Sequence, residues 1–131
     1  MDERISGPVV ILLKPDTFER RLWGSAMGFL QCSTDFKIMD MEFFTPRAPD
    51  GRLVLHYDEH RGKEFYPRLM EFMRSGPLLA IAGETGDVGY LRTRVHSFRE
   101  QWHSRGAMNL LHCSDSIEAG QREKGIWFPS K

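Results

Sequence analysis

The stretch Val9-Val10-Ile11-Leu12-Leu13, followed at once by Lys14-Pro15-Asp16, decides how the chain can fold. Five consecutive aliphatic residues, three of them β-branched, are typical of a strand that is buried on both faces. Proline closes this strand and restricts the residue before it, so we expect Lys14 to be held at the strand end. The sequence therefore predicts a central strand in a covered sheet.

Helical and alternating patterns divide the remaining chain. Helices are predicted over residues 19–32, 53–60, 67–73 and 88–98, and a last helix is capped by Ser114 or Ser116 and stopped by Pro129. Strands are predicted over residues 36–44, 78–82 and 108–111, with a turn-rich connector over residues 46–52. The order β-α-β-α-α-β-α-β-α contains the split β-α-β arrangement. It predicts an α/β fold, a ferredoxin-like sandwich whose four-stranded antiparallel sheet carries packed helices.

Length and composition favour one globular domain over residues 1–131, because a chain of this length can bury a sizeable core. No apolar run approaches a membrane span, and the first residues lack the pattern of a signal peptide. The formal net charge is zero, so a surface specific for nucleic acid is not indicated. Two cysteines without secretory context, Cys32 and Cys113, predict reduced thiols and a cytoplasmic location.

A second stretch, Asn109-Leu110-Leu111-His112-Cys113-Ser114-Asp115-Ser116, places a histidine between a predicted strand and a predicted helix. An imidazole is a nucleophile near neutral pH, and a helix N-terminus supplies backbone N–H donors for an anion. A structural or merely exposed histidine would give the same local pattern, so both interpretations stay open. Cys113 points to the opposite face of a strand from His112, so a thiol–imidazole pair is not expected.

Four arginines fall close together in the sequence before His112, at positions 92, 94, 99 and 105. The planar guanidinium fork matches the oxygens of a phosphate, so these residues favour a phosphate site. A solvated helix face is the alternative interpretation.

Several other motifs point to no site. The sequence contains no Walker-type phosphate loop, no Gly-x-Gly-x-x-Gly after a strand and no Gly-x-Ser-x-Gly. His56 and His60 have the spacing of a metal-binding pair on a helix, but no third ligand accompanies them at a useful spacing. Phe65 and Tyr66 could stack on a base or pack in the core.

Five short elements of this sequence occur together in one known family. They are Leu13-Lys14-Pro15-Asp16, His56-Tyr57, Ser75-Gly76-Pro77, the stretch from Asn109 to Ser116, and Trp127-Phe128. Together they resemble the nucleoside diphosphate kinases, in the right order and over nearly the whole chain. The Asn-x-x-His-x-Ser-Asp-Ser element is the most specific of them, and the family fold is the same ferredoxin-like sandwich.

The resemblance implies a ping-pong transfer of a γ-phosphoryl group from a nucleoside triphosphate to a nucleoside diphosphate. His112 matches the histidine that carries the phosphoryl group. Glu123 matches the glutamate that orients its imidazole, and Ser114 matches the serine beside it. Mg²⁺ would enter with the phosphates of ATP or another nucleoside triphosphate rather than through a dedicated protein site.

The resemblance also implies a nucleotide-binding set. Lys14, Tyr57, Arg99 and Asn109 match positions that bind phosphates and sugar hydroxyls, with Lys14 and Tyr57 close to the transfer itself. Phe65 matches the aromatic residue that stacks on the base. A second phosphate-binding arginine falls on Arg94 or Arg92, and Arg94 is preferred because Val95 follows it.

The sequence departs from the family pattern between Arg94 and Arg99, where only four residues replace a much longer loop. In the family that loop covers the nucleotide and packs between subunits around a threefold axis, so its loss brings the usual hexamer into question. We expect a homo-oligomer whose minimal unit is a dimer formed through Trp23, Met27 and the second strand.

Three smaller departures lie elsewhere in the chain. Gly106 stands where the family has an apolar side chain facing the base, and Thr17 and Arg21 replace two glycines. The resemblance favours a working kinase. Two alternatives stay open: a specialised phosphotransferase with a non-standard acceptor, and a non-catalytic nucleotide-binding or assembly module on the same fold.

Overall fold

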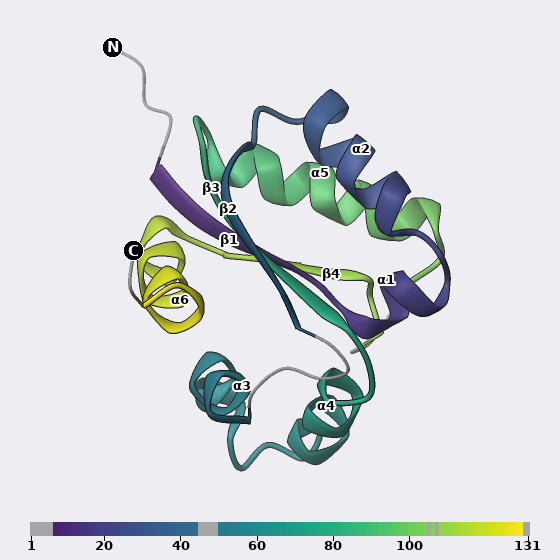
Figure 1. Ribbon diagram of the computed structural model, residues 1–131, viewed down its shortest axis with the longest axis vertical. Helices are drawn as coiled ribbons and strands as arrows, with labels where there is room; N and C mark the ends of the chain where they lie inside the picture. The colour runs from purple at the N-terminus through teal and green to yellow at the C-terminus, as the bar shows by residue number, and fades with distance from the viewer. Residues whose placement is uncertain (1–6, 45–49, 105, 107, 130–131) are drawn as a thin grey trace.

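Four antiparallel strands form one sheet in the computed structural model, which describes residues 7–44, 50–104, 106 and 108–129 (Figure 1). The strands are β1 (Gly7–Leu13), β2 (Lys37–Phe44), β3 (Leu78–Thr85) and β4 (Leu111–Cys113), and their order in the sheet is β2-β3-β1-β4. β1 lies between β3 and β4, and its side chains from Val9 to Leu13 are at most 1% exposed. The prediction of a central strand buried on both faces is confirmed.

Helices cover both faces of this sheet. They are α1 (Pro15–Glu19), α2 (Trp23–Ser33), α3 (Asp50–His56), the 3-10 helix η1 (Asp58–His60), α4 (Tyr66–Met73), α5 (Val88–Gln101) and α6 (Ile117–Trp127). α2 and α5 lie on one face, and α3, α4 and α6 lie on the other (Figure 1). The arrangement confirms the predicted ferredoxin-like α/β sandwich. Among the described residues, none of the helices combines the length and the apolar content that crossing a bilayer requires.

The alternation of side chains along β1 supplies two separate cores. Val9, Ile11 and Leu13 pack with residues of α2 and α5, whereas Val10 and Leu12 pack with residues of α3, α4 and α6. Each fully buried aliphatic side chain contributes about 1.5–3 kcal/mol through removal of its surface from water. One short segment therefore holds both helical layers in place.

α6 approaches β1 closely at Gly120. A Cβ atom at this position would lie 2.0 Å from the carbonyl oxygen of Pro8, a distance that no side chain can adopt. Glycine therefore lets the helix lie directly against the strand, and Glu123, one turn further along α6, comes to lie against the sheet.

The single helix predicted over residues 19–32 is wrong in its first turn. The chain forms α1 and α2 with a break between them, and Arg21 in this break has φ of +58°. A left-handed residue cannot continue a right-handed helix, so the chain changes direction there. The predicted helix over residues 53–60 is likewise divided into α3 and η1.

The fourth strand begins later than the pattern predicted. Residues 108–111 were expected to be extended, but Leu110 has φ of +73°, so the strand runs from Leu111 to Cys113. His112 consequently lies inside β4 rather than after it. Residues 46–49 of the predicted connector lie outside the described residues, as does Arg105. The rest of that prediction is wrong, because residues 50–52 form the first turn of α3.

We expect Arg21→Gly to stabilise the protein, because glycine adopts a positive φ without the steric strain of a Cβ atom. The gain should be about 1 kcal/mol, which corresponds to a rise in melting temperature of about 3 °C. Arg21→Ala is the matched control, since it removes the long side chain but keeps the Cβ atom. A melting temperature that falls in the glycine variant would contradict the prediction.

Candidate active site

His112 lies at the centre of β4, opposite Leu12 of β1. Its side chain is 21% exposed, and its Nε2 atom lies 2.8 Å from Oε1 of Glu123 on α6. A carboxylate can only accept a hydrogen bond, so Nε2 carries the imidazole hydrogen. Nδ1 of the neutral ring therefore keeps its lone pair.

Ser114 binds the same carboxylate oxygen of Glu123 as His112 does. Its hydroxyl donates to Oε1 of Glu123 at 2.7 Å and accepts from the backbone N–H of Val10 at 2.8 Å. Ser116 caps α6 by accepting from the N–H of Ala119 at 3.0 Å, which settles the choice between the two predicted caps. The carboxylate of Glu123, a residue of α6, is thus linked to the central strand β1 by the hydrogen bonds of Ser114.

Burial controls the charge of this pair. Burial lowers the pKa of His112 to about 3, and the positive charges of Lys14 and Arg99 add to the effect. Burial raises the pKa of Glu123, while His56 and the hydroxyl of Ser114 oppose the rise. The imidazole is therefore neutral at neutral pH, which is the state that a nucleophile requires.

Lys14 and Asn109 meet beside the histidine. Nζ of Lys14 donates to Oδ1 of Asn109 at 2.7 Å, although the two residues are 95 positions apart in the chain. The pKa of Lys14 is lowered to about 8, mainly by burial and also by the charge of Arg99, while the charge of Asp16 opposes the shift. Most Lys14 side chains are therefore charged at neutral pH, close to the point of deprotonation.

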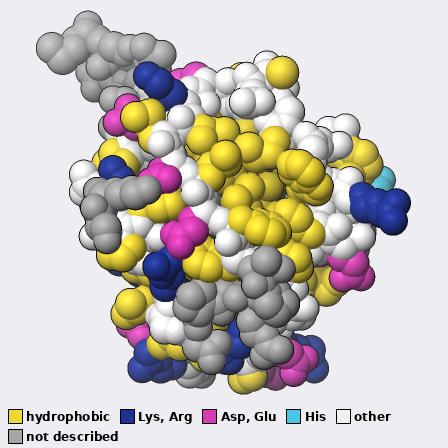
Figure 2. Space-filling view, viewed as in Figure 1, with side chains coloured by type: hydrophobic (Ala, Val, Ile, Leu, Met, Phe, Trp, Pro, Cys, Tyr) yellow, Lys and Arg dark blue, Asp and Glu magenta, His cyan; other side chains and the backbone are white. Residues whose placement is uncertain are grey.

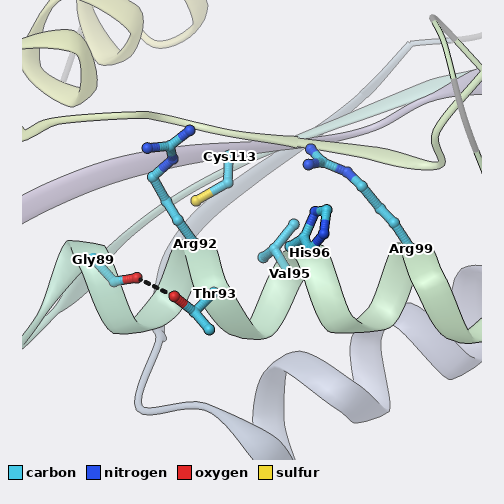
Figure 3. Close-up of a pocket in the computed structure, with 7 residues that line it drawn as sticks. All are labelled: Gly89, Arg92, Thr93, Val95, His96, Arg99 and Cys113. Carbon is cyan, nitrogen blue, oxygen red and sulfur yellow. Dashed lines mark hydrogen bonds between the residues drawn. The ribbon is translucent and has the colours of Figure 1, made fainter.

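Two arginines flank a cavity of about 330 Å³ between α5 and β4. Arg92 and Arg99 extend from α5 toward β4, and His96 lies between them (Figure 3). Arg99 donates to the carbonyl of Leu111 at 2.6 Å, and no acidic side chain in the described part of the chain forms an ion pair with either arginine. Two guanidinium groups without an acidic partner beside one cavity are suited to binding an anion.

Tyr57 and Phe65 differ in their exposure to solvent. Tyr57 is buried, and its hydroxyl has no hydrogen-bond partner among the residues that the structure describes. Burial and the charge of Glu123 raise the pKa of this phenol, so it remains a hydrogen-bond donor. Phe65 is 49% exposed, its ring centroid lies 5.2 Å from that of His60, and Nζ of Lys63 lies 5.8 Å from the same centroid, so part of the ring is accessible to a ligand.

A possible metal cluster is excluded by its own hydrogen bonds. His56, His112 and Glu123 offer ligand atoms within 4.8 Å of one another. However, the indole N–H of Trp127 donates to Nδ1 of His56 at 3.0 Å, so Nε2 of His56 carries the hydrogen and has no lone pair for a metal. His56 ends α3 and His60 lies in η1, so the two histidines do not share one continuous helix.

Arg94 is not brought to this site. Its Nε donates to the carbonyl of Ser33 at 3.2 Å, and its guanidinium lies over the ring of Phe29, on the α2 side of α5. Arg92 occupies the cavity instead. The seven-residue spacing of Arg92 and Arg99 on one helix could have indicated this, since residues seven apart share a helix face.

Sequence reasoning also missed the contact between His56 and Trp127, because nothing in either local pattern reveals a pairing across 71 positions. Cys113 packs in the core shared with α2 and α5 and also lines the cavity between Arg92 and Arg99, whereas the imidazole of His112 is bonded to Glu123 on α6. Burial raises the pKa of Cys113 to about 12, so the thiol is protonated and unreactive.

A neutral imidazole held by a carboxylate, with fixed cations beside it on a ferredoxin-like sandwich, defines a class of phosphoryl-transfer sites. The family model described as "Nucleoside diphosphate kinase" matches residues 8–131. The chain belongs to the nucleoside diphosphate kinase family, whose members are phosphotransferases.

Individual relatives support the family assignment. A nucleoside diphosphate kinase of Streptomyces griseus is 35% identical over 131 residues, which cover 92% of this chain and 94% of the relative. The solved nucleoside diphosphate kinase of Aquifex aeolicus is 27% identical, with a TM-score of 0.79 over 94% of this chain and 95% of the other. An enzyme of Halobacterium salinarum, solved in complex with CDP, is 24% identical, with a TM-score of 0.77 over 94% and 88%.

We expect kcat/KM for phosphoryl transfer to fall about tenfold per pH unit above pH 8, because Lys14 then loses its charge. The stability contributed by this group changes in the opposite direction. Between pH 8 and 10.5 the unfolded chain binds more protons at Lys14 than the folded chain does, so the free energy of unfolding rises with pH.

The measurement is a pH profile of kcat/KM beside a pH series of melting temperatures. Activity that falls while the protein stays folded supports the role of Lys14. A flat profile from pH 7 to 9.5 would contradict it.

Proposed function

We propose that this chain transfers the γ-phosphoryl group of a nucleoside triphosphate to a nucleoside diphosphate through His112. The observation that carries the proposal is the hydrogen bond between Nε2 of His112 and Glu123, which leaves the lone pair on Nδ1. Nδ1 attacks the γ-phosphorus, the bond to the bridging oxygen breaks, and the diphosphate leaves with the electron pair. A terminal oxygen of a second diphosphate then attacks the phosphorus and releases the imidazole.

The remaining side chains act on charge and position. Glu123, held by Ser114, accepts a hydrogen bond from Nε2 of His112. The carboxylate thereby stabilises the positive charge that grows on the ring during attack. Lys14 and Arg99 supply fixed positive charge for the phosphate oxygens, as phosphoryl transfer requires. Tyr57 has a buried hydroxyl available to donate to the transferred group.

A second set of side chains would hold the nucleotide. Arg92 takes the phosphate role that the sequence assigned to Arg94, because it shares a cavity with Arg99. Asn109, bonded to Lys14, would face the sugar, and the open ring of Phe65 would stack on the base. The halobacterial enzyme of the same fold was solved in complex with CDP, which is in keeping with nucleotide binding here.

Mg²⁺ fits this proposal as a companion of the nucleotide. The carboxylate that contacts His112, Glu123, is engaged by His112 and Ser114, and the positive charges of Lys14 and Arg99 act on the same imidazole. The donor set therefore favours a metal ion bound through phosphate oxygens. When bound, the ion neutralises charge on those oxygens during transfer.

A non-standard acceptor is a second candidate. A cavity of about 490 Å³, lined by His96, Arg99, Glu100, Ser104 and Asn109, continues the cavity between Arg92 and Arg99 along α5. Among the described residues, no atom lies within 4 Å of a Cβ position at Gly106. This open space favours acceptors larger than an ordinary nucleoside diphosphate.

We expect His112 to become labelled when the protein is incubated with γ-labelled ATP and Mg²⁺. The label should be acid-labile and base-stable, as a phosphoramidate is, and should be lost in His112→Gln. His103→Asn is the matched control. His103 is exposed and has φ of +54°, a conformation that asparagine tolerates.

Discharge of the phosphoenzyme separates the candidate functions. Rapid discharge to every common nucleoside diphosphate supports an ordinary kinase, whereas a phosphoenzyme that resists them all supports a non-standard acceptor. Folded protein that binds nucleotide without labelling would leave only a non-catalytic binding or assembly module.

We also propose a homodimer formed through β2 and α2. Hydrophobic side chains gather over these two elements (Figure 2), and Trp23, Met39, Met41 and Phe43 are between 50% and 59% exposed. β2 is an edge strand, so its outer backbone groups are available to a second strand. An apolar edge of this kind is typical of an interface.

We expect Met41→Lys to raise the dimer dissociation constant by about 100-fold, because a charged group would be buried at the interface. Light scattering across a dilution series measures the change. Leu55→Lys is the matched control, since Leu55 is 57% exposed but lies on α3. A wild-type protein that is hexameric at low concentration would contradict the proposal.

A further inference from the structure

Leu110 is held in a conformation that favours glycine. Its φ is +73°, yet its side chain is fully buried in the core shared with α2 and α5. An L-residue in this region is strained unless its surroundings hold it there. Because Leu110 directly precedes β4, whatever holds it also decides where β4 begins.

Three of the four residues that follow β1, namely Lys14, Asp16 and Thr17, supply that hold. Oδ2 of Asp16 accepts from the N–H of Leu110 at 3.1 Å, and the backbone N–H of Lys14 donates to its carbonyl at 2.8 Å. The hydroxyl of Thr17 donates to the same carbonyl. Asp16 and Thr17 are at most 2% exposed, so water does not compete for these bonds.

The held residue stands between two residues of the proposed site. Asn109 precedes Leu110 and accepts from Nζ of Lys14 at 2.7 Å, while His112 follows two residues later, opposite Leu12. Rotation of Leu110 into the extended region would turn the side chain of Asn109 away from Lys14. It would also shift β4 against β1, because β4 pairs over only three residues.

Thr17 is one of the departures from the family pattern described above. The family pattern has glycine at this position, which has no hydroxyl to donate. We propose that Thr17 is a positioning residue of the phosphoryl-transfer site: its hydroxyl holds the carbonyl of Leu110 and thereby fixes Asn109 and His112 relative to Lys14. The inference rests on the proposed function of His112.

The test compares Thr17→Val, which keeps the shape but removes the donor, with Thr17→Ser, which keeps the donor. Thr85→Val is the control. Thr85 is also buried, and its hydroxyl donates to Asp35 at 2.6 Å, but it lies at the far end of β3, opposite Gly7. The readouts are melting temperature, the rate of His112 phosphorylation by ATP, and KM for the nucleoside diphosphate.

We expect Thr17→Val to slow phosphorylation about tenfold and to raise KM, because small displacements of reacting groups have large effects on rate. Thr17→Ser should stay within about twofold of wild type, and Thr85→Val should lose melting temperature without either kinetic change. If Thr17→Val loses melting temperature but keeps the wild-type rate and KM, Thr17 is merely structural and the inference is wrong.

Hydrogen exchange separates failure of this inference from failure of the proposed function. The N–H of Leu110 should exchange faster in Thr17→Val than in wild type or Thr17→Ser, whether or not the protein transfers phosphate. Wild-type protein that is never labelled by ATP would refute the proposed function. Unchanged exchange at Leu110 in Thr17→Val would refute the hold by Thr17.

Discussion

The pairing of β1 with β4 is the constraint on which the rest of the structure depends. It sets His112 opposite Leu12, and the backbone bond from Lys14 to Leu110 extends it by one further residue. β1 can impose this register because both of its faces are buried, so a shift by one residue would exchange the two cores. A lysine and a histidine almost one hundred positions apart are brought together as a consequence of packing.

Burial also determines the chemistry. Burial, and then the positive charges of Lys14 and Arg99, lower the pKa of His112, so the imidazole stays neutral. Its lone pair is therefore available to an electrophile and is not occupied by a proton. Glu123 then restricts the neutral ring to one tautomer. The same burial makes Lys14 an unusually acidic lysine, so the site combines a permanently ready nucleophile with a cation that is close to losing its proton.

The sequence predicted the layers of the fold because hydrophobic periodicity reports burial directly. β1 and β2 were anticipated from it, whereas α4, α5 and α6 were placed by the Gly, Pro and capping residues that bound them. The errors in the helix predicted over residues 19–32 and in the strand predicted over residues 108–111 share one cause. Arg21 and Leu110 adopt a positive φ, which cannot be predicted from the identity of a non-glycine residue. Glu123 and Lys14 were assigned through a family resemblance, whereas the bond from Trp127 to His56 and the direction of Arg94 depend on tertiary contacts that no local pattern records.

The unbroken course of α5 has a consequence for how an anion is received. Arg92 and Arg99 are separated by seven residues of one helix, a rise of roughly 10 Å. Their spacing is therefore a property of a regular backbone and not of a loop that must be ordered when a ligand arrives. Less backbone conformational entropy is lost when an anion binds to two arginines on a regular helix than when it must order a loop. The helix therefore provides two positioned charges but does not enclose the bound anion as a covering loop would.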